Sequence, residues 1–144
     1  MVVLSKKSSE RLCSLTMEIT VNCKGQAEAL CERSNTAKEM GSGSLLVYAT
    51  PSMVALMEEA ACNAIAEALP EEKTSVGISM DIQHVAATPV GLEVRAEATV
   101  TEVSGKIITF SVEAFDENGQ IGKGTHKRCI VDTQRFLDKA YEKI

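Results

Sequence analysis

The segment TPSMVALMEEAACNAIAEAL, residues 50–69, decides which fold the rest of the chain can adopt. It opens with Thr50 and Pro51, which is typical of an N-cap followed by a proline in the first helical turn, and Pro70 follows it directly. No Gly interrupts the segment, and Ala, Leu, Met and Glu dominate it, so its helix propensity is high. The sequence therefore predicts one long helix over residues 50–69.

One carboxylate of this helix points in an unusual direction. At about 100° per residue, the bulky apolar side chains share one broad arc, and Glu59, Asn63 and Glu67 share the opposite side. Glu58 falls inside the apolar arc. A carboxylate directed into a core costs free energy unless it is paired or functional. Glu58 is therefore a candidate site residue, and a snorkelling or interface glutamate is the alternative.

The segments on either side of the helix favour strands. Residues 13–21 alternate between apolar and polar side chains, which predicts a half-buried strand, whereas residues 26–31 allow a short helix. Residues 40–44, MGSGS, predict a loose connection or lid. Beyond the long helix, turn sequences rich in Gly separate segments with strand character. These predicted strands are residues 74–86, 92–103, 106–116 and 120–132, and a last helix is predicted over residues 133–143 with Thr133 as N-cap.

This order of elements determines the predicted architecture. A sheet that follows such a long helix must curl around it to cover its apolar face. The sequence therefore predicts an α+β hotdog fold, an antiparallel sheet wrapped around one long central helix, in a single domain of residues 1–144. Exposed strand edges and an Ala-rich helix also favour a homodimer.

The composition excludes several classes of function. A net charge of −5 and a pI of about 5.1 argue against a nucleic-acid partner. The chain has neither an apolar run long enough for a bilayer nor the charge order of a secretory signal, so we expect a cytoplasmic protein with no membrane contact. Its five cysteines form no CxxC pair, which favours reduced thiols and argues against a zinc or other metal site.

The first predicted strand after the helix contains a second unusual residue. Strict alternation places His84 on the same face as Val76, Ile78, Met80 and Ile82, which is the face toward the helix. A lone inward histidine is more often an ordinary core residue. Together with Glu58, however, His84 forms a candidate general acid–base set in one apolar pocket.

Three further positions are weaker candidates. Thr50 is most simply a helix cap, although the N–H groups at a helix start can also hold an oxyanion. Gly77 is either a bulge or a place where a ligand meets the backbone. In residues 122–128, GKGTHKR, alternation places His126 and Arg128 on one face with two glycines, in a frame that does not fit a P-loop. Arg128 is either a surface charge or the grip for a phosphate or carboxylate, and His126 is expected to matter much less than His84.

Three segments together resemble a known family. They are ATPSMVALMEEAA from residue 49, GISMDIQHVAATPVG from residue 77 and IGKGTHKR from residue 121. They resemble the fluoroacetyl-CoA thioesterase family of hotdog proteins over residues 49–128. The resemblance implies a catalytic threonine, glutamate and histidine at Thr50, Glu58 and His84, an active-site glycine at Gly77 and a substrate-binding arginine at Arg128.

The resemblance fails at the lid of the fluoroacetate-selective member. Two phenylalanines of that lid correspond to Gly41 and Ser44, and residues 1–109 contain no Phe. The expected function is therefore hydrolysis of another short or medium acyl-CoA to the free acid and CoA, with no cofactor besides the CoA of the substrate. A hotdog dehydratase or hydratase and a non-catalytic acyl-CoA-binding module remain alternatives.

One distance conflicts with a site built from a single chain. Eight helical residues span about 12 Å, so Thr50 and Glu58 of one helix do not reach the same carbonyl group. Either Thr50 lies off the helix path, or one of the two residues comes from a dimer partner.

Overall fold

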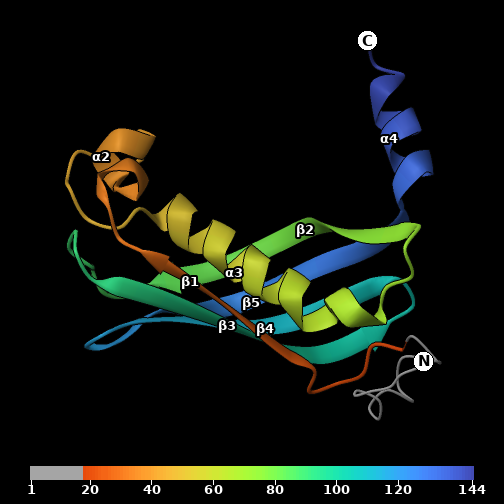
Figure 1. Cartoon of the computed structure of the whole chain (residues 1–144), viewed down its shortest axis with the longest axis horizontal. Coiled ribbons are helices and arrows are strands. Elements are labelled where there is room, and N and C mark those ends of the chain that lie inside the picture. Colours follow the sequence, from red (N-terminus) through yellow and green to blue (C-terminus); the bar gives the residue numbers. More distant parts are fainter. Residues whose placement is uncertain (1–17) are drawn as a thin grey trace.

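An antiparallel sheet and one long helix dominate residues 18–144, which are the residues that the computed structural model describes. Figure 1 shows the elements in place. The strands are β1 (Lys24–Leu30), β2 (Lys73–His84), β3 (Glu93–Ser104), β4 (Ile107–Asp116) and β5 (Gly119–Asp132). The helices are η1 (Arg33–Asn35), α2 (Ala37–Met40), α3 (Thr50–Ile65), η2 (Ala66–Ala68) and α4 (Thr133–Tyr141).

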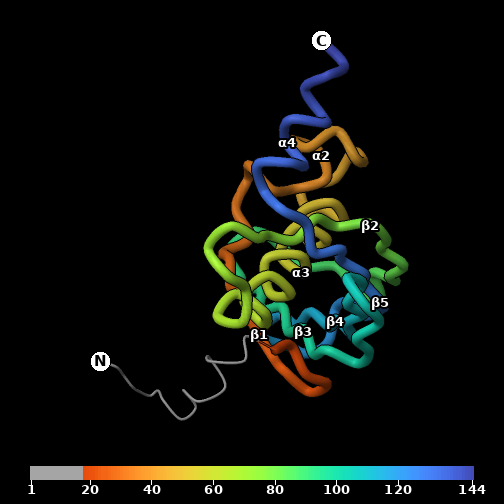
Figure 2. The backbone as a smooth tube through the Cα atoms, turned by 90° about the vertical axis from the view of Figure 1, so that its right-hand side faces the viewer, coloured from red at the N-terminus to blue at the C-terminus, as the bar shows by residue number. Residues whose placement is uncertain are grey.

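The strands form one sheet in the order β1-β3-β4-β5-β2, with every neighbouring pair antiparallel. The sheet curls around α3, as the end-on view in Figure 2 shows. This is the predicted α+β hotdog arrangement, and the four strands predicted after the long helix differ from the observed ones only at their ends.

Helix α3 has the predicted two-sided character. Its buried residues are Met53, Leu56, Met57, Ala60, Ala61 and Ile65, whereas Glu59, Asn63 and Glu67 are exposed. The buried face packs on inward side chains of β3 and β4, among them Val100 and Phe110. Regular α-helix ends at Ile65, and a 3-10 turn continues the chain toward Pro70.

Both predicted N-caps were wrong by one residue. Ala49 holds the N-cap position of α3, so Thr50 is the first helical residue and its hydroxyl group is left for another partner. In α4 the N-cap is Asp132, whose carboxylate accepts a hydrogen bond from the backbone N–H of Arg135.

The N-terminal predictions were also wrong where the structure describes them. Residues 26–31 do not form a helix, because most of them belong to β1, which pairs with β3. Residues 18–22 form no strand and end in a turn, and residues 13–17 lie outside the described part. Gly25 explains why β1 can lie so close to α3: a Cβ atom there would collide with the backbone of Ala60 and Ala64. Tertiary packing therefore overrides the local helix propensity of this segment.

A β-bulge changes the predicted faces of β2. The register with β5 shifts between Gly77 and Ser79, so the simple alternation breaks at Ile78. Met80 and Ile82 pack against the core as predicted. Ile78 is instead 51% exposed, and Gly77 faces the helix.

Within residues 18–144, none of the helices has the length and apolar character that a membrane span requires.

Candidate active site

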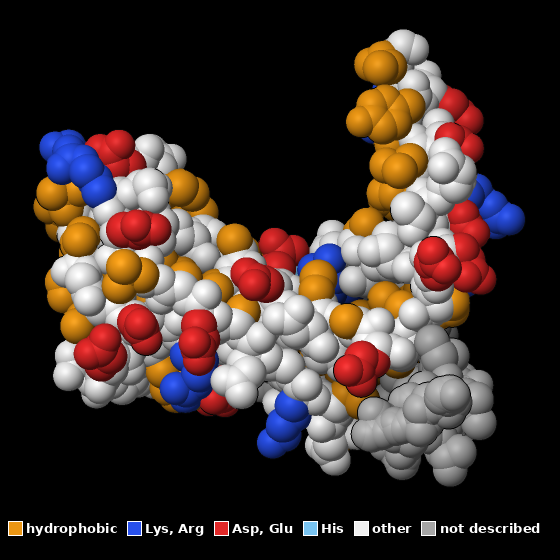
Figure 3. Space-filling model, viewed as in Figure 1, with side chains coloured by type: hydrophobic (Ala, Val, Ile, Leu, Met, Phe, Trp, Pro, Cys, Tyr) orange, Lys and Arg blue, Asp and Glu red, His pale blue; other side chains and the backbone are white. Residues whose placement is uncertain are grey.

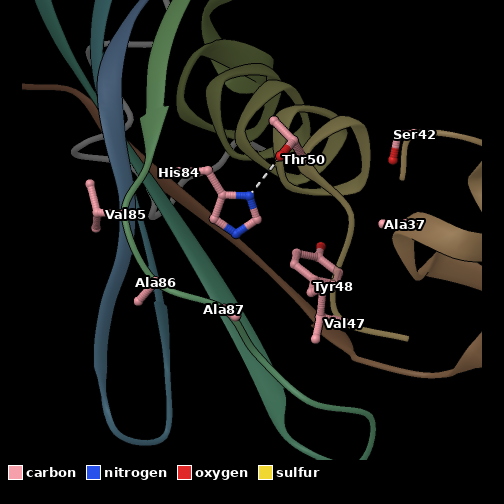
Figure 4. A pocket seen from close by; sticks show the side chains of 9 residues that line it. All are labelled: Ala37, Ser42, Val47, Tyr48, Thr50, His84, Val85, Ala86 and Ala87. Atoms are coloured by element: carbon pink, nitrogen blue, oxygen red, sulfur yellow. Dashed lines mark hydrogen bonds between the residues drawn. The ribbon is translucent and has the colours of Figure 1, made fainter. Parts of the chain in front are cut away.

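Thr50 and His84 form a hydrogen-bonded pair at the start of α3. The Thr50 hydroxyl oxygen lies 2.8 Å from Nδ1 of His84, the last residue of β2 (Figure 4). Burial lowers the pKa of the His84 imidazole below 6.5, although the nearby backbone of Ala86 opposes this shift. The ring is therefore neutral near pH 7, and it can exchange a proton with the Thr50 hydroxyl group.

The other ring nitrogen of His84, Nε2, is buried and has no hydrogen-bond partner among the described residues. The ring borders a pocket of about 340 Å³ beside the start of α3 (Figure 4). Besides Tyr48 and His84, mostly small side chains line this pocket, including Ala37, Ser42, Val47, Ala86 and Ala87. Nε2 consequently has an unused hydrogen-bonding position next to the pocket, beneath the surface of the protein.

A second cluster surrounds Glu58, further along the same helix. Nη1 of Arg128 donates to Oε2 of Glu58 at 3.3 Å, and the same nitrogen lies 3.1 Å from Nε2 of His126. His126 and Arg128 are only 1% and 6% exposed, whereas 41% of the Glu58 side chain is exposed. Glu58 is thus a paired carboxylate with access to solvent, which lowers the cost of its position in the apolar arc of the helix.

Gly77 makes room for this carboxylate. It pairs with Arg128 across β2 and β5, on the strand face that points to α3. A Cβ atom at Gly77 would collide with Oε2 of Glu58. Arg128 is fixed from the other side, since its Nε donates to Oγ of Ser75 at 2.8 Å and its Nη2 to the Ser75 carbonyl oxygen at 3.1 Å.

The structure therefore divides the predicted site residues into two groups. Thr50 lies with His84, and Glu58 lies with Gly77 and Arg128. The predicted acid–base pair of Glu58 with His84 is not formed within one chain, because Glu58 contacts the Arg128 and His126 side chains instead.

His126 is the residue that the sequence argument set aside. It points into the core next to Arg128, and its ring stacks on Phe110 of β4. The signal was present in the sequence, since alternation already placed His126 on the face of Arg128. The prediction that His126 matters less than His84 did not take its contact with β4 into account. That contact follows from the order of strands in the sheet, which the sequence pattern does not contain.

Within the described residues, no group of three or more His, Cys, Asp or Glu side chains is placed to hold a metal ion.

Comparisons with known proteins settle the family. The family model for fluoroacetyl-CoA-specific thioesterases matches residues 31–134. The chain belongs to this family. The fluoroacetyl-CoA thioesterase of Streptantibioticus cattleyicolor is 38% identical over 97 residues, which cover 67% of this chain and 70% of that protein.

Solved structures agree with this assignment. A structure of the fluoroacetyl-CoA thioesterase FlK has a TM-score of 0.82 at 29% identity, and the match covers 88% of this chain and 98% of that one. A Thermus thermophilus protein described as a thioesterase superfamily member has a TM-score of 0.76 at 27% identity, over 88% of this chain and 98% of that one. A hot-dog-like protein from Thermanaerovibrio acidaminovorans, at 24% identity over 88% of this chain and 93% of that one, has a TM-score of 0.79 and supports the fold. The predicted family and the hotdog fold are confirmed.

Proposed function

We propose that this family member hydrolyses a short or medium acyl-CoA to the free acid and CoA. The observation that carries the proposal is the Thr50–His84 pair, whose second ring nitrogen is buried without a partner beside a pocket. Attack on a thioester needs a proton-accepting group, a nucleophile and donors for the oxyanion. Water and protein groups supply all of these, so we expect no cofactor besides the CoA of the substrate.

The two clusters support different tasks in this reaction. Glu58 is the nucleophile or the general base that takes a proton from water, and the Arg128 guanidinium holds its carboxylate in place. If Thr50 attacks the carbonyl carbon, His84 takes the hydroxyl proton and passes it to the leaving thiolate, and water activated by Glu58 then hydrolyses the acyl-threonine. If Thr50 only orients the carbonyl group, the proton that the thiolate takes up comes from the attacking water. The N–H groups at the start of α3, or that of Gly77, bind the oxyanion.

We propose that two copies of the chain form a dimer through β2. On one side β2 pairs with β5, and on its other edge it has no strand partner within residues 18–144. Exposed apolar side chains lie along this strand and just beyond its end, with Ile78 at 51% and Val85 at 53% exposure. An open apolar edge of this kind invites a second strand.

Helix α4 carries a second exposed apolar surface that a partner chain at β2 could contact. It stands away from the sheet, and its apolar side faces back over the molecule (Figure 3). Its exposed apolar residues are Phe136, Leu137 and Tyr141. A second copy paired along β2 would cover part of this face.

We also propose a cytoplasmic location. Cys23, Cys31, Cys62 and Cys129 are free thiols, and reduced cysteines are typical of that compartment.

The pocket supports a substrate longer than fluoroacetyl-CoA. Ser42 lines it, and the lid positions of the fluoroacetate-selective member are Gly41 and Ser44 here. Small side chains leave volume that two phenylalanine rings would fill. Because each buried methylene adds up to about 0.8 kcal/mol of binding, a longer acyl chain is favoured as far as the pocket accepts it.

One assay tests this function. We expect release of free thiol from a panel of acyl-CoAs, with a larger kcat/KM for butyryl-CoA or longer chains than for acetyl-CoA or fluoroacetyl-CoA. Binding without thiol release would indicate a non-catalytic module, and a double bond gained or lost without thiol release would indicate a hydratase or dehydratase. A clear preference for fluoroacetyl-CoA over acetyl-CoA would overturn the proposed selectivity.

A further inference from the structure

His126 is one of the most deeply buried polar side chains of the described residues, and the proposed reaction gives it no task. Its side chain is 1% exposed and lies on β5, between β2 and β4. The imidazole ring stacks on Phe110, with ring centroids 6.0 Å apart and an angle of 27° between the planes. The ring is therefore held in one plane.

The hydrogen bonds of this ring fix its tautomer. Nδ1 of His126 lies 2.8 Å from the carbonyl oxygen of Ser79, which can only accept, so Nδ1 carries the proton. In a neutral ring Nε2 then has a free lone pair. It lies 3.1 Å from Nη1 of Arg128, a group that can only donate. The neutral Nδ1–H form satisfies both contacts.

Every part of the Arg128 guanidinium group has a partner. Nε and Nη2 donate to the side chain and the carbonyl oxygen of Ser75, and Nη1 lies near both His126 and Glu58. The two hydrogens of Nη1 can serve Nε2 of His126 and Oε2 of Glu58 at once. The bonds to Ser75 hold the other edge of this planar group, so without an acceptor at His126 the Nη1 end would keep Glu58 as its one remaining partner.

We propose that His126 is a positioning residue, a neutral acceptor that orients Arg128 so that the Glu58 carboxylate is held beside Gly77. This inference rests on the proposed function in so far as Glu58 takes part in hydrolysis. If a catalytic carboxylate is displaced by about 1 Å, the reaction rate can fall about a hundredfold.

The surroundings of His126 preserve this neutral form. Burial is the main cause that lowers the pKa of His126 below 6.5, and the positive charge of Arg128 lowers it further. The hydrogen bond to Ser79 and the negative charge of Glu58 act in the opposite direction. These groups come from β2, β5 and α3, and Phe110 of β4 adds no charge. A proton on Nε2 would face the N–H group of Arg128, so two donors would meet and Nη1 would lose an acceptor.

Two substitutions separate positioning from packing. In His126→Gln, the side-chain oxygen can take the place of Nε2 and accept from Arg128. In His126→Asn, the shorter amide can still donate to Ser79 but does not reach Arg128. We expect His126→Gln to keep kcat within about threefold of wild type and His126→Asn to lower kcat at least about tenfold, both with nearly unchanged KM. Equal loss in both variants, or a better Asn variant, would overturn the proposal.

A spectroscopic measurement tests the same inference without activity. Nitrogen-15 NMR of the wild-type protein should show His126 as the Nδ1–H tautomer at pH 7. It should also show slow rotation of the Arg128 guanidinium group, assigned by comparison with Arg128→Lys. Rotation should be as slow in His126→Gln as in wild type and measurably faster in His126→Asn, where the bonds to Ser75 and Glu58 remain. The Nε2–H tautomer, or a freely rotating Arg128 in wild type, would overturn the proposal even if a variant failed to fold. If the spectra are as expected but the wild-type protein releases no thiol from any acyl-CoA, the proposed function is rejected. The role of His126 in orienting Arg128 would still stand.

Discussion

The Thr50 hydroxyl group lies 2.8 Å from one ring nitrogen of His84, and the other ring nitrogen is buried without a partner. An unpartnered buried nitrogen costs free energy, and such costs tend to be retained at functional sites. A substrate carbonyl or thiol group in the adjacent pocket would supply the missing partner. We therefore expect His84 to contribute more to turnover than to stability.

Replacing His84 tests this expectation. His84→Ala should slow turnover about a hundredfold or more, the usual scale of acid–base help. Gln83→Ala is the matched control, because Gln83 is exposed and lies on the opposite face of β2. Steady-state thiol release measures both variants. Similar rates for the two would remove His84 from the mechanism.

The buried histidines also determine how stability depends on pH. Burial lowers the pKa of both His84 and His126 below the unfolded value of 6.5, so around pH 6 the unfolded chain binds more protons than the folded chain. The free energy of unfolding should therefore be insensitive to these groups above pH 6.5 and fall as the pH drops through their lowered pKa values. Urea titrations at several pH values measure this slope. It should be shallower in His84→Ala and in His126→Gln, and an unchanged slope in both would contradict the prediction.

A substitution at Gly77 tests whether the position of Glu58 is needed for activity. In Gly77→Ala the new methyl group would meet the end of the flexible Glu58 side chain, which can move. We expect a kcat at least about tenfold lower and a modest loss of stability, because Glu58 loses its place beside Arg128, which is buried. In Gly124→Ala, by contrast, the methyl group would meet the backbone of Asp81 and Ile82, so that variant should lose more stability. Full activity in Gly77→Ala would mean that the position of Glu58 is not critical.

The sequence argument singled out Glu58 and His84, and within one chain each of them has a different partner from the predicted one. Helical phase predicted the direction of Glu58, and strand phase predicted that of His84, because both depend on nearby residues alone. The partners of Glu58 depend on the bulge at Ile78 and on the β5–β2 register, which no local pattern contains. His126 was set aside for the same reason.

At the scale of elements, β1 depends on its contact with α3. The strand residue Gly25 lies against the backbone of Ala60 and Ala64, and Ala27 on the same face is buried. Small side chains on both elements allow this close approach. The same residues explain the failed prediction: Gln, Ala, Glu and Leu favour a helix locally, and only the pairing with β3 makes the segment a strand. The long helix and the later strands carry local patterns strong enough to be predicted.

A single methyl group should disturb this contact. Gly25→Ala is expected to lower the free energy of unfolding by about 1–3 kcal/mol, since backbone atoms of α3 cannot move aside as a side chain can. Glu28→Ala, on the exposed side of β1, should change it by less than about 0.5 kcal/mol. Urea denaturation gives both values. A stabilised Gly25→Ala would show that β1 and α3 are less tightly packed than the structure indicates.

At the scale of the whole molecule, the two clusters lie too far apart to act on one carbonyl group. Thr50 and Glu58 are separated by about 12 Å along α3. Pairing of two β2 edges, as proposed for the dimer, runs the strands in opposite directions about a twofold axis. The His84 end of one strand would then approach the Gly77 region of the other. Thr50 and His84 of one copy would in this way face Glu58 and Arg128 of the second copy.

Mixed dimers test whether the site is shared. Thr50→Ala and Glu58→Gln should each be inactive as homodimers. A heterodimer of the two, purified through different tags, should recover about half of the wild-type activity, because the intact Thr50 of one copy meets the intact Glu58 of the other at one of two symmetric sites. The matched control is a heterodimer of Thr50→Ala with His84→Ala. It should stay inactive, because these two residues act from the same chain and each site would lack one of them. An inactive Thr50→Ala/Glu58→Gln heterodimer that is still a dimer by sedimentation would show that the two clusters do not combine across the twofold axis.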